Sequence, residues 1–144
     1  MTTSFSNPPL DELRRLLQDT RAIAVVGLSD NPARPSHRVC GYLQAAGYRI
    51  VPVNPALSEV LGERAWPDLD SVPGELDMVC LFRRSEEVPP LAEAAVRRGA
   101  RSLWMQDHVV HAPAALMARE AGLVVVMNDC LLRRHQQLLG PPIP

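Results

Sequence analysis

The sequence contains few aromatic residues and no excess of charge of either sign. It has two residues each of Trp, Tyr and Phe, and its 15 Lys and Arg residues are balanced by 16 Asp and Glu residues. Surfaces that bind nucleic acids combine a basic stripe with aromatic side chains on which bases stack. The composition therefore argues against a nucleic-acid partner.

Patterns typical of disulfide frameworks, structural zinc sites and membrane spans are also absent. Cys40, Cys80 and Cys130 are odd in number, far apart and without a C-x-x-C pair, which favours reduced thiols. No apolar run approaches the length of about 18 residues that a membrane span needs, and the polar segment 1–9 does not resemble a signal peptide. We expect a cytoplasmic protein with no membrane partner.

A hydrophobic share of 47% in 144 residues is sufficient for one globular core. We expect a single domain over residues 1–144, with its core at about 10–136. Apolar runs alternate with amphipathic segments along the chain. Strands are predicted over residues 22–26, 48–53, 77–82, 101–105 and 123–127, and helices over 9–19, 36–47, 85–99, 113–122 and 131–139. This alternation predicts a doubly wound, Rossmann-like α/β fold of about five parallel strands with helices on both faces.

Several local features are less regular. Ser36 and Ser85 precede helical patterns and are predicted to cap them. Pro52 cannot donate to a neighbouring strand, which places strand 48–53 near a sheet edge or an irregularity. Between residues 56 and 76 we expect a short extended piece at 64–66 and one helical turn near Leu69.

The loop from Gly27 to Ser36 has the composition of a phosphate-binding turn. A buried strand ends at Gly27, polar turn-forming residues follow, and a helical pattern then begins. Backbone N–H groups and a helix N-terminus in this arrangement can receive phosphate. Because doubly wound folds bind ligands at the carboxyl ends of their strands, the loops 27–36, 54–55, 82–84 and 104–106 should converge on one crevice.

The loop lacks most of the dinucleotide fingerprint G-x-G-x-x-G. Its three positions are Gly27, Ser29 and Pro32, so only the first glycine is present. The second strand ends at Val53-Asn54-Pro55, without the acidic residue that binds the ribose 2′-hydroxyl of NAD. Both observations disfavour NAD, and an extra phosphate near that ribose would be tolerated.

Four segments in order, residues 23–36, 47–55, 82–86 and 99–106, together resemble the small stand-alone CoA-binding proteins, which are related to the CoA-binding domain of the succinyl-CoA synthetase α subunit. The resemblance covers roughly residues 10–136. It implies a Rossmann-like domain that binds coenzyme A. Gly27, Leu28 and Ser29 would lie against the ADP pyrophosphate, Arg34 and Ser36 would assist at phosphate, Val53, Asn54 and Pro55 would flank the adenosine, and Phe82 and Arg83 would line the crevice. Asn31 and Gln106, from two of the converging loops, complete the predicted cofactor-binding set.

The chain departs from the family pattern in two places. Asp107-His108 follow Gln106 where the family usually has a small residue, at the pantetheine end of the ligand. Near the C-terminus, Asn128-Asp129-Cys130 and Arg134-His135 stand where the family has Asp-Arg-Cys and Glu-His. Cys130 matches the family, and a role for the missing glutamate cannot be transferred.

No catalytic constellation or metal site stands out in the sequence. His108 and His111 are three residues apart but have no evident third ligand. We expect Cys40, Cys80 and Trp104 in the core, and Cys130 at a loop end is a candidate reactive thiol near the CoA sulfur.

The first hypothesis is a non-catalytic carrier, sensor or regulatory module that binds CoA or an acyl-CoA. The alternatives are an NAD(P)-dependent oxidoreductase, a subunit of an acyl-CoA ligase whose ATP-binding domain we do not expect in these 144 residues, or a fold used for contacts with a protein partner or a homo-oligomer.

Overall fold

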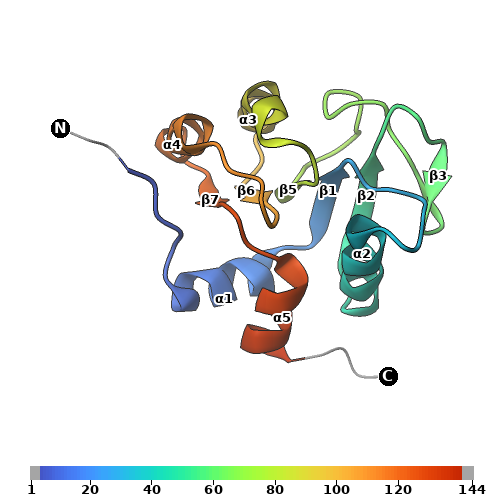
Figure 1. Ribbon diagram of the computed structural model, residues 1–144, viewed down its shortest axis with the longest axis horizontal. Coiled ribbons are helices and arrows are strands. Elements are labelled where there is room, and N and C mark those ends of the chain that lie inside the picture. Colours follow the sequence, from blue (N-terminus) through green and yellow to red (C-terminus); the bar gives the residue numbers. More distant parts are fainter. Residues whose placement is uncertain (1–3, 141–144) are drawn as a thin grey trace.

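The computed structural model describes residues 4–140 as three layers of helix, sheet and helix (Figure 1). Residues 1–3 and 141–144, which belong to the expected domain of 1–144, lie outside the described residues. The helices are α1 (Leu10–Asp19), α2 (Pro35–Ala45), α3 (Val88–Arg97), α4 (Ala112–Glu120) and α5 (Leu131–Leu139), with a short 3-10 helix η1 (Ser85–Glu87) before α3. The central strands are β1 (Ala22–Val26), β2 (Arg49–Val53), β5 (Met78–Leu81), β6 (Ser102–Met105) and β7 (Val124–Val126), and β3 (Glu59–Val60) and β4 (Glu63–Arg64) form a small hairpin.

The five central strands are all parallel and lie in the order β2-β1-β5-β6-β7. The predicted doubly wound, Rossmann-like fold is therefore confirmed. Strand β2 forms the edge of this sheet, and Pro52 lies opposite Val25 of β1. The edge position expected from that proline is also confirmed, since an edge strand needs donors on one side alone.

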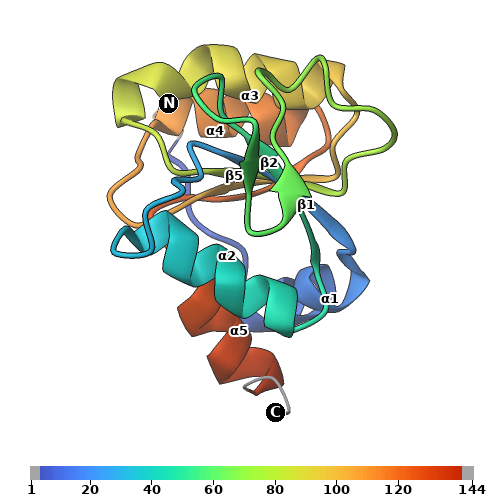
Figure 2. The same ribbon diagram turned by 90° about the vertical axis from the view of Figure 1, so that its right-hand side faces the viewer.

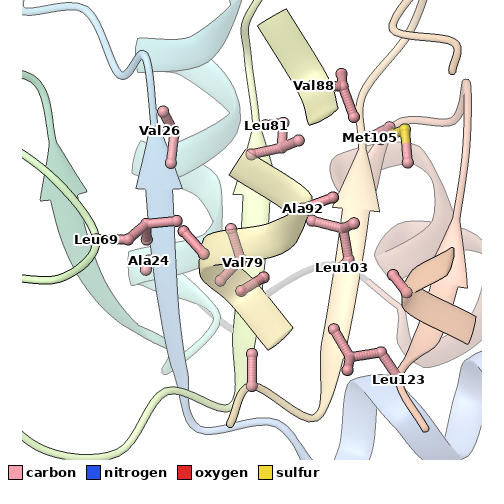
Figure 3. Close-up of a cluster of buried hydrophobic side chains, with 14 of the residues drawn as sticks. Ala24, Val26, Leu69, Val79, Leu81, Val88, Ala92, Leu103, Met105 and Leu123 are labelled. Atoms are coloured by element: carbon pink, nitrogen blue, oxygen red, sulfur yellow. The ribbon is translucent and has the colours of Figure 1, made fainter. Parts of the chain in front are cut away.

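Helices cover both faces of the sheet, with α3 and α4 on one side and α1, α2 and α5 on the other (Figure 2). Successive side chains of a strand point to opposite faces. Ala24 and Val26 of β1 therefore pack toward α3 and α4, whereas Ile23 and Val25 pack toward α1, α2 and α5. Figure 3 shows the first of these layers, in which Val79, Leu81, Leu103 and Met105 lie with Val88 and Ala92 of α3.

The connection from β2 to β5 is the irregular part of the fold. The expected extended piece is present, because β4 pairs with β3 and Trp66 forms a parallel bridge to Val53. Near Leu69 the chain forms a hydrogen-bonded turn, in which the N–H of Val72 donates to the Leu69 carbonyl at 3.3 Å, and no helix. Leu69, Val72 and Leu76 are buried in the core, so apolar burial rather than a helix holds this crossover on the sheet.

The two predicted serine caps are wrong, for different reasons. Helix α2 begins one residue earlier, with Arg34 as its N-cap, because the fixed φ of Pro35 suits the first helical position. The Ser36 hydroxyl accepts a hydrogen bond from the N–H of Ser29 at 3.0 Å. Ser85 starts η1, and its hydroxyl accepts from the N–H of Val110 at 2.9 Å. Both hydroxyls therefore tie loops together instead of capping an α-helix.

His135 of α5 makes stability sensitive to acid. Its Nδ1 lies 2.8 Å from the Tyr42 hydroxyl, and burial lowers its pKa. The unfolded chain takes up a proton near the ordinary pKa of about 6.5, whereas the native chain does so only at lower pH. Stability is therefore lost as the pH falls below about 6.5.

We expect His135→Gln to flatten this loss of stability, as measured by urea unfolding at a series of pH values between about 7.5 and 5. His37→Gln, which leaves the Tyr42 contact intact, should retain the wild-type slope. Equal slopes for wild type and His135→Gln would contradict the role of His135.

Candidate functional site

The strand order reverses at β1, which makes its carboxyl end the expected ligand site of the fold. Strand β2 follows β1 in the chain and pairs on one side of it, whereas β5 pairs on the other side. The loops after β1 and β5 diverge from this point in opposite directions, and doubly wound folds bind ligands in the crevice that results. In this structure Gly27 lies directly against Phe82 and Arg83 at this point.

Gly27 has no room for a side chain. A Cβ on this residue would lie 2.3 Å from the carbonyl oxygen of Phe82 and 2.9 Å from Cδ of Arg83, and its φ of +88° is one that other residues rarely adopt. The N–H of Gly27 donates to the Val53 carbonyl at 3.0 Å. Gly27 thus brings the loops after β1, β2 and β5 into direct contact.

The polar loop after Gly27 is held in place by its own side chains. The Ser29 hydroxyl accepts from the N–H of Asn31 at 3.0 Å, and Asn31 Oδ1 accepts from the N–H of Ala33 at 3.0 Å. The Leu28 side chain is fully buried, and its carbonyl accepts from Nδ2 of Asn54 at 3.1 Å. Leu28 can therefore contact a ligand only through its backbone atoms.

A large cleft opens between this loop, α2, the loops after β5 and β6, and the start of α5. It has a volume of about 970 Å³. Seven of the predicted site residues line it, namely Gly27, Ser29, Arg34, Ser36, Phe82, Arg83 and Gln106. We call this space the main cleft. It brings together loops 27–36, 82–84 and 104–106 as expected, but residues 54–55 do not line it, so the expected single crevice is wrong in this respect.

A second cleft of about 490 Å³ lies on the β2 side of Gly27 and is called here the side cleft. Val53, Asn54 and Pro55 line it, together with Asp68 and Leu91 among others. Gly27, Arg83 and Glu87 line both clefts, and Arg83 pairs with Glu87 at 2.7 Å. The predicted site residues are thus divided between two adjoining spaces, and Leu28 and Asn31 line neither.

Helix α2 presents its N-terminus and two arginines to the main cleft. No side chain caps its first turn, and a helix N-terminus attracts anions. Arg34 and Arg38 line the cleft, and neither forms a salt bridge with a carboxylate of residues 4–140. Arg38 was not predicted as a site residue, because the sequence indicates it only by its place one turn beyond Arg34.

Paired charges line the opposite wall, at the start of α5. Arg133 donates two hydrogen bonds to Asp107, at 2.6 and 2.7 Å, and this bonding lowers the pKa of the Asp107 carboxyl. Behind this pair, Arg134 donates to Asp129 at 2.5 Å. Arg133 was not predicted as a site residue, because nothing in the sequence indicates its partner.

The cysteines differ in their access to the main cleft. Cys40 and Cys80 are fully buried in the core, as expected, and burial raises the pKa of Cys80 to about 12. The Gln106 side-chain amide donates to Sγ of Cys80 at 3.3 Å. Cys130 lines the cleft as the N-cap residue of α5 and is 8% exposed, so the loop-end thiol is mostly covered.

Of the two histidines considered as metal ligands, His111 uses its imidazole in another contact, whereas the contact of His108 is made by its backbone. Nδ1 of His111 accepts from the N–H of Ala114 at 3.1 Å and so caps α4. The backbone N–H of His108 donates to Oδ1 of Asn128 at 2.7 Å. In the described part of the chain, no three His, Cys, Asp or Glu side chains are grouped to hold a metal ion. Likewise, no helix within residues 4–140 has the length and apolarity to cross a membrane.

Comparison with known proteins identifies the family of this chain. The family model described as a CoA binding domain matches residues 21–136. The chain belongs to this CoA-binding domain family. It is 43% identical to the uncharacterized protein YneT of Bacillus subtilis over 131 residues, which cover 91% of this chain and 97% of YneT.

A solved structure and a larger enzyme extend the comparison. The structure of a hypothetical protein from Pyrococcus horikoshii superimposes with a TM-score of 0.91 at 34% identity, covering 97% of this chain and 99% of that one. The ADP-forming acetate–CoA ligase II of Archaeoglobus fulgidus is 25% identical over 83 residues, which are 56% of this chain and 12% of the ligase. The family is thus related to the CoA-binding part of acyl-CoA ligases, as the sequence resemblance implied.

Proposed function

We propose that this protein binds coenzyme A or an acyl-CoA at the strand-order switch and acts as a non-catalytic carrier, sensor or regulatory module. The observation that supports it most strongly is Gly27, where a backbone without a side chain lies between two clefts. The pyrophosphate lies against Gly27 and Ser29, within reach of Arg34. The adenosine occupies the side cleft beside Val53, Asn54 and Pro55, and the pantetheine extends into the main cleft.

The end of β2 disfavours NAD as the ligand. Asn54 occupies the position at which NAD-binding proteins have an acidic residue that accepts a hydrogen bond from the ribose 2′-hydroxyl. Its side chain is committed elsewhere, since Nδ2 donates to the Leu28 carbonyl and Oδ1 accepts from the N–H of Ala56 at 2.9 Å. A phosphate-rich ligand also suits the two arginines of α2, which lack acidic partners within residues 4–140.

A thermal unfolding panel with CoA, acetyl-CoA, NAD and NADP tests this choice of ligand. A ligand at about 100 times its Kd stabilises the native state by about 2.7 kcal/mol, which raises Tm by several degrees. We expect CoA and acetyl-CoA to raise Tm. A rise with NAD or NADP and none with CoA or acetyl-CoA would overturn the proposal in favour of an oxidoreductase.

Arg34→Ala should weaken CoA binding by about 1–3 kcal/mol if its guanidinium pairs with phosphate. Titration calorimetry measures the change. Arg15→Ala, which removes the same charge from the exposed face of α1, serves as the control and should bind CoA as the wild type does. Equal affinities for the Arg34 and Arg15 variants would show that Arg34 is only a solvated charge.

The non-catalytic role has its own test. Acetyl-CoA incubated with the protein and analysed by chromatography should be recovered intact, because the proposed site offers binding groups without an assigned nucleophile and base. Steady release of free CoA at a rate proportional to protein concentration would contradict this part of the proposal.

A further inference from the structure

The Asp107–Arg133 ion pair joins two elements on the wall of the main cleft that lies opposite α2. Asp107 follows β6, Arg133 lies in the first turn of α5, and both line the cleft. The pair is bidentate, at 2.6 and 2.7 Å, although both side chains remain partly exposed. A ligand extending along the cleft toward α5 therefore meets a carboxylate and a guanidinium that already satisfy each other.

Charge is distributed unevenly along this cleft. On the α2 side, Arg34 and Arg38 have no acidic partner within residues 4–140, whereas on the α5 side Arg133 pairs with Asp107 and Arg134 pairs with Asp129. Phosphates are held best where positive charge is unpaired. The phosphate end of the ligand therefore lies toward α2, and its thiol end points toward Gln106 and α5.

On the basis of the proposed function, we propose that the Asp107–Arg133 pair selects the group attached to the CoA sulfur. The free thiol and small neutral acyl groups are accepted, and acyl groups that end in a carboxylate are rejected. A terminal carboxylate would face the like charge of Asp107, while the positive charge of Arg133 is already balanced by its bidentate bond to Asp107 and by Asp129, whose Oδ1 lies 3.6 Å from Nη2. Specificity then comes from a repulsive element in the site rather than from an added attraction.

Butyryl-CoA and succinyl-CoA provide a matched pair of probes, because their acyl chains have the same length and differ in the terminal carboxylate. Titration calorimetry should show butyryl-CoA binding to the wild type about tenfold or more tightly than succinyl-CoA. Asp107→Asn removes the negative charge and the bidentate partner of Arg133, whose remaining carboxylate neighbour is Asp129, at 3.6 Å. This variant should bind succinyl-CoA about tenfold or more tightly than the wild type, with butyryl-CoA changed by less than about twofold.

Three further variants make the test decisive. Asp107→Asn combined with Arg133→Gln should lose the gain for succinyl-CoA, because the cation is gone. Arg133→Gln alone leaves Asp107 unopposed and should weaken succinyl-CoA further, which provides a second test if Asp107→Asn fails to fold. Glu120→Gln, an equal charge change at the exposed end of α4, should behave as the wild type.

The outcomes separate this inference from the function on which it rests. Equal affinity of the wild type for the two thioesters, or an Asp107→Asn variant that gains nothing for succinyl-CoA, overturns the selection by this pair while CoA binding still stands. If neither CoA nor either thioester binds the wild type, the proposed function itself fails.

Discussion

Gly27→Ala is expected to lower the free energy of unfolding by about 3 kcal/mol, from roughly 1–2 kcal/mol of left-handed strain and roughly 1–3 kcal/mol of steric overlap. The added methyl group would lie 2.3 Å from the Phe82 carbonyl oxygen, which is backbone and cannot rotate away. The loops after β1 and β5 must then separate. Urea unfolding followed by tryptophan fluorescence measures the loss of stability.

The same substitution should weaken CoA binding at least about tenfold, because the loops that position the phosphates would shift. Gly74→Ala is the control for strain without overlap. Gly74 has a φ of +82°, close to the +88° of Gly27, but nothing lies within 4 Å of the added Cβ. We expect it to lose about 1–2 kcal/mol and to bind CoA normally. Equal losses in the two variants would show that the contact between the loops is unimportant.

Trp104→Ala is expected to be strongly destabilising, with a loss of about 4–6 kcal/mol in the free energy of unfolding. Trp104 is fully buried in β6 and its Nε1–H donates to the Asp129 carbonyl at 2.9 Å. Truncating a buried tryptophan costs about 3–5 kcal/mol, and the carbonyl left without its donor adds about 1 kcal/mol. Native domains are stable by about 5–15 kcal/mol in all, so this loss removes a large share of the total stability.

Circular dichroism during urea unfolding measures this effect without relying on tryptophan fluorescence. The control is Trp66→Ala, since Trp66 is only partly buried and stacks under Arg64, with the guanidinium carbon 4.0 Å from the ring centroid. We expect Trp66→Ala to lose less than half as much stability. A smaller loss for Trp104→Ala than for Trp66→Ala would contradict the packing of β6 described above.

The sheet and its helices could be predicted because their apolar runs are short, regular and separated by clear breaks. Ala22–Val26 is buried on both faces, and buried parallel strands are continuous apolar runs. The connection over residues 56–76 has no such regularity. Its hairpin and the bridge from Trp66 to Val53 depend on β2 being present beside it, which a local pattern does not reveal.

The sequence alone was enough to predict that loops meet at the carboxyl ends of the strands, because this follows from the topology of the fold. Contacts between surface residues that are distant in the sequence could not be predicted in this way. In the sequence, Arg38 and Arg133 look like ordinary solvated arginines. Asp107 contacts Arg133 because the loop after β6 and the start of α5 lie side by side at the cleft. Leu28 was placed against pyrophosphate by resemblance, but the structure buries its side chain and leaves the backbone for that role.

Titration calorimetry of the wild-type chain with CoA, and separately with NAD, tests the central claim most directly. We expect saturable binding of one CoA per chain and no measurable binding of NAD at the same concentrations. Saturable binding of NAD with no heat from CoA would contradict a CoA site at the strand-order switch.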